Sequence, residues 1–229
     1  LITGYKRFGD ERKLKKDPIN HLLELYVKVN NSSELEQEAR DWFKKLEKGD
    51  KETLELWKKF RNSSLKEFDK IYKLLNVKFD VVSGESEYNK KMEKTLAELK
   101  KKGLLKVSEG AQVVDLEKYG LGVCLIKKSD GATLYTTRDI TAAIDRYKKY
   151  HFEKMIYEVG SEQKLHFKQF FKVLELMGYS WARNCSHVAH GLYLDSDGKK
   201  FATRKGKTVF MMNILNETID LAKKEISKR

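Results

Sequence analysis

The stretch LYTTRDITAAIDRYKKYHFEKMIYEVGSEQ, residues 134–163, decides the fold. It has the pattern of a short strand, a helix, a second strand and the start of a second helix. Apolar residues at helical spacing predict a helix over about 138–149 with one buried face; they are Ile140, Ala143, Ile144 and Tyr147. Residues 155–159, MIYEV, form a mostly apolar run closed by Gly160, which is typical of a strand buried in a parallel sheet. The stretch therefore predicts an α/β domain.

Three polar side chains of this stretch fall where its predicted elements begin or end: Tyr135, Asp139 and Gln163. In such a sheet, ligands bind beyond the carboxyl ends of the strands, so we expect the three to converge on one pocket. A carboxylate there favours a cationic ligand, because it pairs strongly and selectively with a guanidinium. Each residue also has a purely local interpretation, since an Asp early in a helix interacts with the amide dipoles, a Tyr packs and a Gln caps. Spacing alone leaves the ligand of this pocket unassigned.

Composition points to the class of partner. The chain has 229 residues, 40% of them hydrophobic, and a formal net charge of +13. A cationic surplus of this size favours a polyanion such as nucleic acid or a polyphosphate, and is also compatible with a solvated lysine-rich surface. The chain starts at Leu1 and stops at Arg229 within a helical pattern, which suggests a piece of a longer protein.

Several features predict a cytoplasmic location. No apolar run approaches the roughly 20 residues of a membrane span, and no signal peptide opens the chain. The two cysteines, Cys124 and Cys185, match no metal-binding spacing, so we expect neither a disulfide nor a metal. His187 and His190 fall in a predicted buried strand, HVAHGL, but would point to its opposite faces.

Outside the central stretch, residues 19–76 read as consecutive helices, with capping boxes expected at Ser33 and Ser64 and an N-cap at Asp50. A strand is predicted over 77–84 and a helix over 86–103. Three short strand candidates follow as a small antiparallel patch, over 104–107, 112–116 and 123–128.

A glycine-punctuated basic loop precedes the predicted last helix, which carries Leu215, Ile219, Ala222 and Ile226. The loop contains Lys199, Lys200, Arg204, Lys205 and Lys207 around Gly206. Its cations suit a growing negative charge on phosphate, although a solvated basic hairpin has the same composition.

These segments together resemble the class I aminoacyl-tRNA synthetases, specifically arginyl-tRNA synthetases of the eukaryotic cytosolic type. The resemblance covers the whole chain and is carried by FDVVSGES (79–86), KKSDGATLYTTRDI (127–140), YHFEKMIYEVGSEQKLHFKQFFKVLELMGY (150–179), HVAHGL (187–192) and KKFATRKGKTVFM (199–211). It implies an α/β fold, the second half of a Rossmann-like parallel sheet preceded by a mostly helical insertion with a small β patch. The implied boundaries are 1–128 for the insertion and 129–229 for the catalytic half.

The resemblance also implies a function, an arginine–tRNA ligase of protein biosynthesis. Such an enzyme activates L-arginine with ATP, accompanied by Mg²⁺, to arginyl-adenylate and transfers it to the acceptor end of tRNA(Arg). The residues matching the arginine site are Tyr135, Asp139 and Gln163. Those matching the ATP site are Gly160, Glu162, His166, His187, Val188 and Thr203. The loop of the KMSKS type would act in catalysis through Lys200, with Arg204 or Lys205 as the second cation.

The HIGH signature of the class, which belongs to the other half of the fold, is absent from residues 1–229. We therefore expect this chain alone to be inactive, because stabilising the transition state requires both sides of the phosphate site. A non-catalytic basic RNA-binding or regulatory protein is the alternative, and a purely structural helical module is a third reading.

Overall fold

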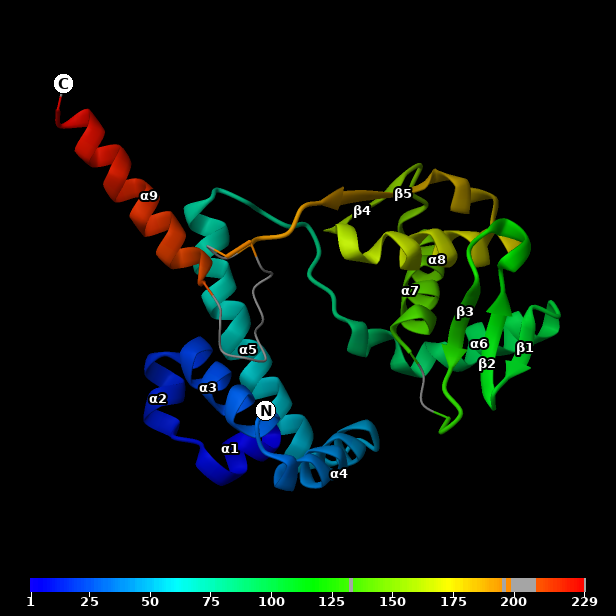
Figure 1. The fold of residues 1–229 in the computed structure, drawn as a ribbon, viewed down its shortest axis with the longest axis horizontal. Helices are drawn as coiled ribbons and strands as arrows, with labels where there is room; N and C mark the ends of the chain where they lie inside the picture. The colour runs from blue at the N-terminus through cyan, green and yellow to red at the C-terminus, as the bar shows by residue number, and fades with distance from the viewer. Residues whose placement is uncertain (132–133, 195–196, 199–208, 229) are drawn as a thin grey trace. The chain divides into compact units, whose positions relative to one another are not determined.

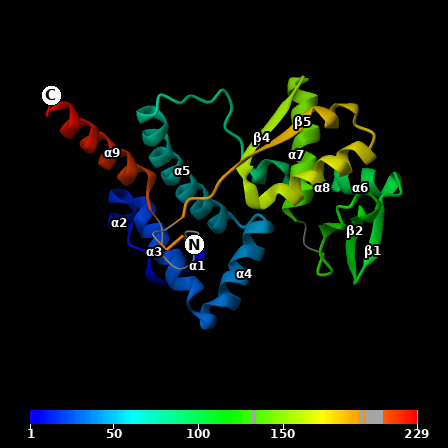
Figure 2. The same ribbon diagram turned by 45° about the horizontal axis from the view of Figure 1, so that its top comes forward.

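The computed structural model describes residues 1–131, 134–194, 197–198 and 209–228 (Figures 1 and 2). The chain forms two compact units, one made of Leu1–Asp80 with Tyr193–Arg229 and the other of Val81–Leu192. The predicted boundary at 128 falls inside the second unit. It does not separate the compact units because Cys124 and Ile126, which precede it, share one core with Ile140 and Phe170, which follow it.

The first unit is helical. Its helices are α1 (Ile2–Phe8), α2 (Glu11–Lys16), α3 (Pro18–Asn30), α4 (Glu36–Glu47), α5 (Lys51–Leu74) and α9 (Met211–Ile226), with a 3₁₀ turn at Ser33–Leu35. A small core joins α2, α3 and α5 through Leu14, Leu22 and Phe60. Helix α9 contains no buried residue. None of the helices in the described residues is long and apolar enough to cross a membrane.

Local predictions in this part were partly wrong. The Asp50 cap is confirmed, since its carboxylate accepts a hydrogen bond from the Thr53 amide at 3.0 Å. The break expected at Ser64 is absent because α5 runs through it, and a serine inside a helix is only mildly unfavourable. The capping box at Ser33 does not form, because a 3₁₀ turn occupies Ser33–Leu35 and α4 begins at Glu36. Residues 77–84 form no strand; none of the strands in the described residues pairs with them, and Val82 is 62% exposed.

The second unit contains two sheets and the helices between them. A 3₁₀ segment (Glu85–Lys91) leads into α6 (Met92–Lys101), then β1 (Leu105–Ser108), β2 (Ala111–Asp115) and β3 (Val123–Lys127). These strands form an antiparallel sheet in the order β1-β2-β3, as predicted. Next come α7 (Tyr135–Tyr150), β4 (Met155–Gly160), a 3₁₀ turn (Ser161–Gln163), α8 (Lys164–Leu176), a 3₁₀ turn (Ser180–Asn184) and β5 (Cys185–His190).

Strands β4 and β5 pair in parallel, in register from Met155 opposite Cys185 to Gly160 opposite His190. Helices α7 and α8 lie between this pair and the antiparallel sheet in both views (Figures 1 and 2). Their buried faces meet in one core that contains the fully buried Phe170, Leu174 and Ile140. The predicted periodicity of α7 is therefore confirmed, because this helix buries one stripe.

Two predictions for this unit were wrong. The strand predicted at the start of 134–163 is absent, because α7 already begins at Tyr135. The Thr137 hydroxyl, fully buried, donates a hydrogen bond to the Ile126 carbonyl at 2.6 Å, and this tertiary contact holds a β-branched segment in the helix. Strand β5 is half-exposed rather than buried, with Val188 at 51%, because only β4 pairs with it in the described part of the sheet.

Candidate functional site

Helix α7 presents a polar face to an open pocket of about 940 Å³. The face recurs at intervals of three and four residues, which lie on one side of a helix. Its polar members are Tyr135, Arg138, Asp139 and Arg146, and the buried Ala142 lies between them. The apolar and threonine residues between them, such as Ile140 and Thr137, turn into the core. One helix thus supplies a wall of the pocket and a share of the core at the same time.

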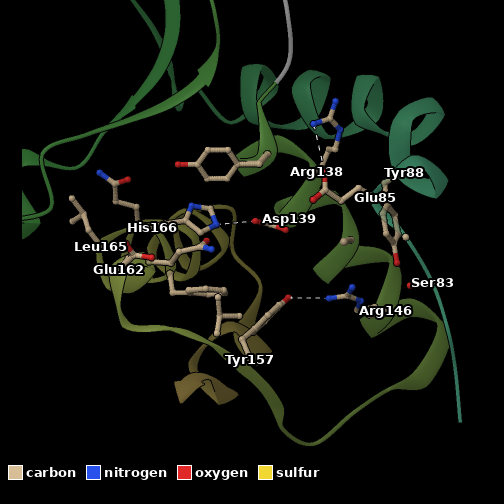
Figure 3. A pocket seen from close by; sticks show the side chains of 17 residues that line it. Ser83, Glu85, Tyr88, Arg138, Asp139, Arg146, Tyr157, Glu162, Leu165 and His166 are labelled. Atoms are coloured by element: carbon tan, nitrogen blue, oxygen red, sulfur yellow. Dashed lines mark hydrogen bonds and ion pairs between the residues drawn. The ribbon is translucent and has the colours of Figure 1, made fainter. Parts of the chain in front are cut away.

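The opposite wall comes from β4 and the start of α8. Tyr157 and Val159 project from the strand, and Glu162, Gln163 and His166 follow its carboxyl end. A third wall comes from the 3₁₀ segment before α6, which contributes Glu85 and Tyr88 (Figure 3). The site thus lies beyond the carboxyl end of a parallel strand, as predicted from the sequence.

The Asp139 carboxylate is paired within the pocket. Its Oδ2 lies 2.8 Å from Nε2 of His166 (Figure 3). An ionised carboxylate has no hydrogen to give, so Nε2 carries the hydrogen and donates it. The Asp139 side chain is 33% exposed and that of His166 only 7%. The carboxylate therefore remains accessible to a ligand while the imidazole behind it is buried.

Arg146 lies deeper along the same face of α7. Its guanidinium carbon is 5.9 Å from the ring centroids of both Tyr88 and Tyr157, at cation–π distance. Its Nη1 lies 3.4 Å from the Tyr157 hydroxyl, as a long hydrogen bond (Figure 3). Burial raises the pKa of Tyr157, and the nearby Arg146 cation opposes that rise. The phenol is therefore neutral at physiological pH and cannot act as a counter-ion.

Arg138, which also lines the pocket, contacts two side chains of the 3₁₀ segment. Its Nη1 lies 3.8 Å from the Glu85 carboxylate, and its Nε donates to the Asn89 side chain at 3.3 Å. These contacts join α7 to the 3₁₀ segment before α6.

The structure brings together the three residues predicted to hold the arginine substrate. Tyr135, Asp139 and Gln163 all line the pocket, although Tyr135 reaches it from a first helical turn instead of a strand end. Of the residues predicted to contact ATP, Glu162 and His166 line the same pocket.

Three further residues predicted for ATP, Gly160, His187 and Val188, are not among those that line this pocket. Gly160 ends β4, and His187 turns its imidazole to the Val159 carbonyl, 2.8 Å away, and stacks on Phe167. Val188 is exposed on β5. Lys200, Thr203, Arg204 and Lys205, predicted for the phosphate loop, are outside the described residues.

Sequence reasoning missed Arg146, Tyr88 and Tyr157 as pocket residues. A signal for Arg146 was available, because it follows Asp139 by seven residues, two helical turns along the same face. Nothing local pointed to Tyr88, which comes from another segment.

Comparison with known proteins identifies the family. A sequence model described as tRNA synthetases class I (R), catalytic domain, matches residues 1–229. Arginine–tRNA ligase 2 of Bacillus anthracis is 51% identical over 233 residues, covering all of this chain and 41% of that protein. Arginine–tRNA ligase of Clostridium perfringens is 50% identical with the same coverage. The chain thus spans about two-fifths of the length of these curated relatives.

Solved structures share the fold. Arginyl-tRNA synthetase from Plasmodium falciparum superposes with a TM-score of 0.71 at 24% identity, over 100% of this chain and 37% of that one. The Thermus thermophilus arginyl-tRNA synthetase gives a TM-score of 0.72 at 18% identity, over 98% of this chain and 44% of that one. Both relatives at about 50% identity are bacterial, so the eukaryotic cytosolic type stays a prediction. Because the family model matches from the first residue to the last, this chain belongs to the class I (R) tRNA synthetases, within their catalytic domain.

Proposed function

We propose that the protein containing this chain is an arginine–tRNA ligase. In the first step the carboxylate of L-arginine attacks the α-phosphorus of ATP, forming arginyl-adenylate and releasing pyrophosphate. In the second, a hydroxyl of the terminal ribose of tRNA(Arg) attacks the arginyl carbonyl and AMP leaves. Mg²⁺ would enter with the phosphates of ATP.

One observation carries the proposal: the accessible Asp139 carboxylate in a pocket that Tyr135 and Gln163 also line. A guanidinium has five N–H donors in a planar fork, and a carboxylate satisfies two of them in one plane. The Tyr135 hydroxyl and the Gln163 amide can accept further N–H groups or donate to a ligand carboxylate. These groups together favour binding of a planar cation over binding of an uncharged side chain.

The names of the relatives support the same reaction, since both curated proteins named above are arginine–tRNA ligases. The catalytic role in phosphate handling remains part of the proposal for Lys200, Arg204 and Lys205. The proposal also keeps the ATP-site residues Gly160, Glu162, His166, His187, Val188 and Thr203. A cytoplasmic location remains a prediction too.

The test is ATP–pyrophosphate exchange with the natural protein, expressed with every residue its gene encodes. We expect exchange that depends on L-arginine and is absent with lysine, citrulline or no amino acid. Citrulline is the informative control, because it has the shape of arginine without the charge. Exchange with citrulline as fast as with arginine, or none with any amino acid, would contradict the proposal.

The net charge of +13 also suits a protein that binds RNA without chemistry. That alternative predicts tRNA binding by the natural protein with no exchange at all, so the same assay separates the two.

A further inference from the structure

His166 joins two of the residues proposed to hold arginine. Its Nε2 lies 2.8 Å from Oδ2 of Asp139, and its ring meets the ring of Tyr135 edge-on at 4.7 Å between centroids. Tyr135 and Asp139 are one helical turn apart on α7, whereas His166 comes from α8. A single imidazole therefore contacts both of these pocket-lining side chains of the opposite helix.

The imidazole is itself held by the core. Its side chain is 7% exposed. The ring lies nearly parallel to that of Phe170 at 6.0 Å, with a 10° angle between planes, and contacts Phe167 at 5.2 Å. Phe170 is fully buried. A ring packed in this way has few rotamers open to it, so its N–H points in a defined direction.

A fixed donor defines the orientation of its acceptor. An unpaired carboxylate on a helix surface samples several rotamers, and a ligand that needs one of them must order the side chain on binding. The bond to His166 engages one lone pair of Oδ2 and leaves the other sites of the carboxylate for a ligand. Asp139 is thereby preorganised for a planar guanidinium, which requires both oxygens in its own plane.

We propose that His166 is a positioning residue for arginine: it orients the Asp139 carboxylate and supports the Tyr135 ring. This inference rests on the proposed function and gives His166 a role on the amino-acid side of the site, where the sequence placed it on the ATP side. His166 acts through its neighbours and need not touch either substrate.

Two substitutions separate the hydrogen bond from the ring. His166→Phe keeps a flat ring against Phe170 and Tyr135 and removes the donor, whereas His166→Gln keeps an N–H at the position of Nε2 and removes the ring. In the natural protein, we expect His166→Phe to raise the KM for arginine about tenfold, or about 1.4 kcal/mol. The KM for ATP and kcat should change by less than about twofold, because the loss concerns arginine binding alone. His166→Gln should stay within about threefold of the unsubstituted KM for arginine, since its amide can still donate to Asp139.

A double-substitution cycle on the arginine KM distinguishes a role through Asp139 from a purely structural role of His166. If His166 acts through Asp139, then His166→Phe should produce little further rise in the arginine KM once Asp139→Asn is present. Independent additive effects, or a KM for ATP that rises as much as that for arginine, would overturn the inference. So would an unchanged arginine KM in His166→Phe.

The unsubstituted protein provides a test that does not depend on any variant folding. The imidazole nitrogen signals in a ¹⁵N NMR spectrum should show His166 with hydrogen on Nε2, and the signal should shift in Asp139→Asn. A hydrogen on Nδ1 alone would refute the pairing. Failure of the proposed function looks different: the unsubstituted protein would then show no arginine-dependent exchange, whatever the state of His166.

Discussion

Asp139 Oδ2 and His166 Nε2 lie 2.8 Å apart and join helices α7 and α8 at the pocket. The two residues are 27 positions apart in sequence, and their contact links the two helices at the pocket. The carboxylate is partly exposed in the pocket and the buried imidazole lies behind it. This arrangement is what a recognition carboxylate requires: access for a ligand and a defined orientation.

Asp139→Asn should weaken arginine binding in the natural protein. The amide keeps the size of the side chain and an oxygen for His166, and loses only the charge that attracts a guanidinium. We expect the KM for arginine to rise about 30-fold. This factor is at the low end of the cost of breaking a buried charge pair, because Asp139 is partly exposed. The KM for ATP should change little. Steady-state exchange kinetics measure both constants.

Asp145→Asn is the matched control for this change. Asp145 lies on the same helix and pairs with Lys91 at 2.5 Å, with about a third of its side chain exposed. Loss of such a surface pair should leave both KM values within about twofold. If the two substitutions raised the KM for arginine equally, arginine binding would depend on the overall charge of α7 and not on Asp139 itself.

Arg146→Met should destabilise the second unit. The change removes two cation–π contacts and a hydrogen bond, with Tyr88 and Tyr157 as the partners, while most of the aliphatic stem remains. We expect the free energy of unfolding to fall by about 1–2 kcal/mol. Arg146→Lys should recover only part of this, because an ammonium does not stack on rings as a flat guanidinium does.

Urea denaturation measures the change, and Arg183→Met serves as the control, since Arg183 is exposed. A loss for Arg183→Met as large as that for Arg146→Met would contradict a role for the two tyrosines.

Phe170→Ala should be among the most damaging core substitutions. Phe170 is fully buried between α7, β4 and the antiparallel sheet, and truncation leaves a cavity. The expected loss is about 3–5 kcal/mol in the free energy of unfolding. Leu165→Ala, on the same helix but 56% exposed, should change it by less than about 0.5 kcal/mol. Similar midpoints of chemical denaturation for the two variants would refute this packing.

The two thiols should react slowly in the native state. Burial raises the pKa of Cys124 to about 12 and that of Cys185 to about 11. A raised thiol pKa means that the folded chain favours the protonated form. This contribution to stability is complete below the usual thiol pKa and is lost as pH rises towards 11 and 12.

Labelling with a thiol-specific disulfide reagent at pH 8 should therefore be slow for both residues in the native protein, and much faster in urea. Cys185 should react before Cys124, which is only 1% exposed. Cys124→Ala and Cys185→Ala assign the two phases. Rapid native labelling of Cys124 would show that the core around β3 opens easily.

Sequence by itself determined the elements whose side chains repeat with a clear period. The helix over 138–149, the strand over 155–159 and the three short strands before them followed from the spacing of apolar residues, because burial of one face is a local pattern. The sequence also predicted that Tyr135, Asp139 and Gln163 converge on one pocket, but its reason holds only for Gln163, which follows the parallel strand β4; Tyr135 and Asp139 reach the pocket from the start of α7.

Only the tertiary structure decided which partners these side chains have. His166 pairs with Asp139, a contact that its predicted place in the ATP site did not include, and Arg146 lies between Tyr88 and Tyr157. The sequence predicted a strand over 77–84, but no strand in the described part of the chain pairs with it. Tyr135 begins a helix, in which Thr137 bonds to β3. Each of these outcomes depends on contacts between segments far apart in the chain, and a local pattern carries no information about the identity or direction of a distant partner.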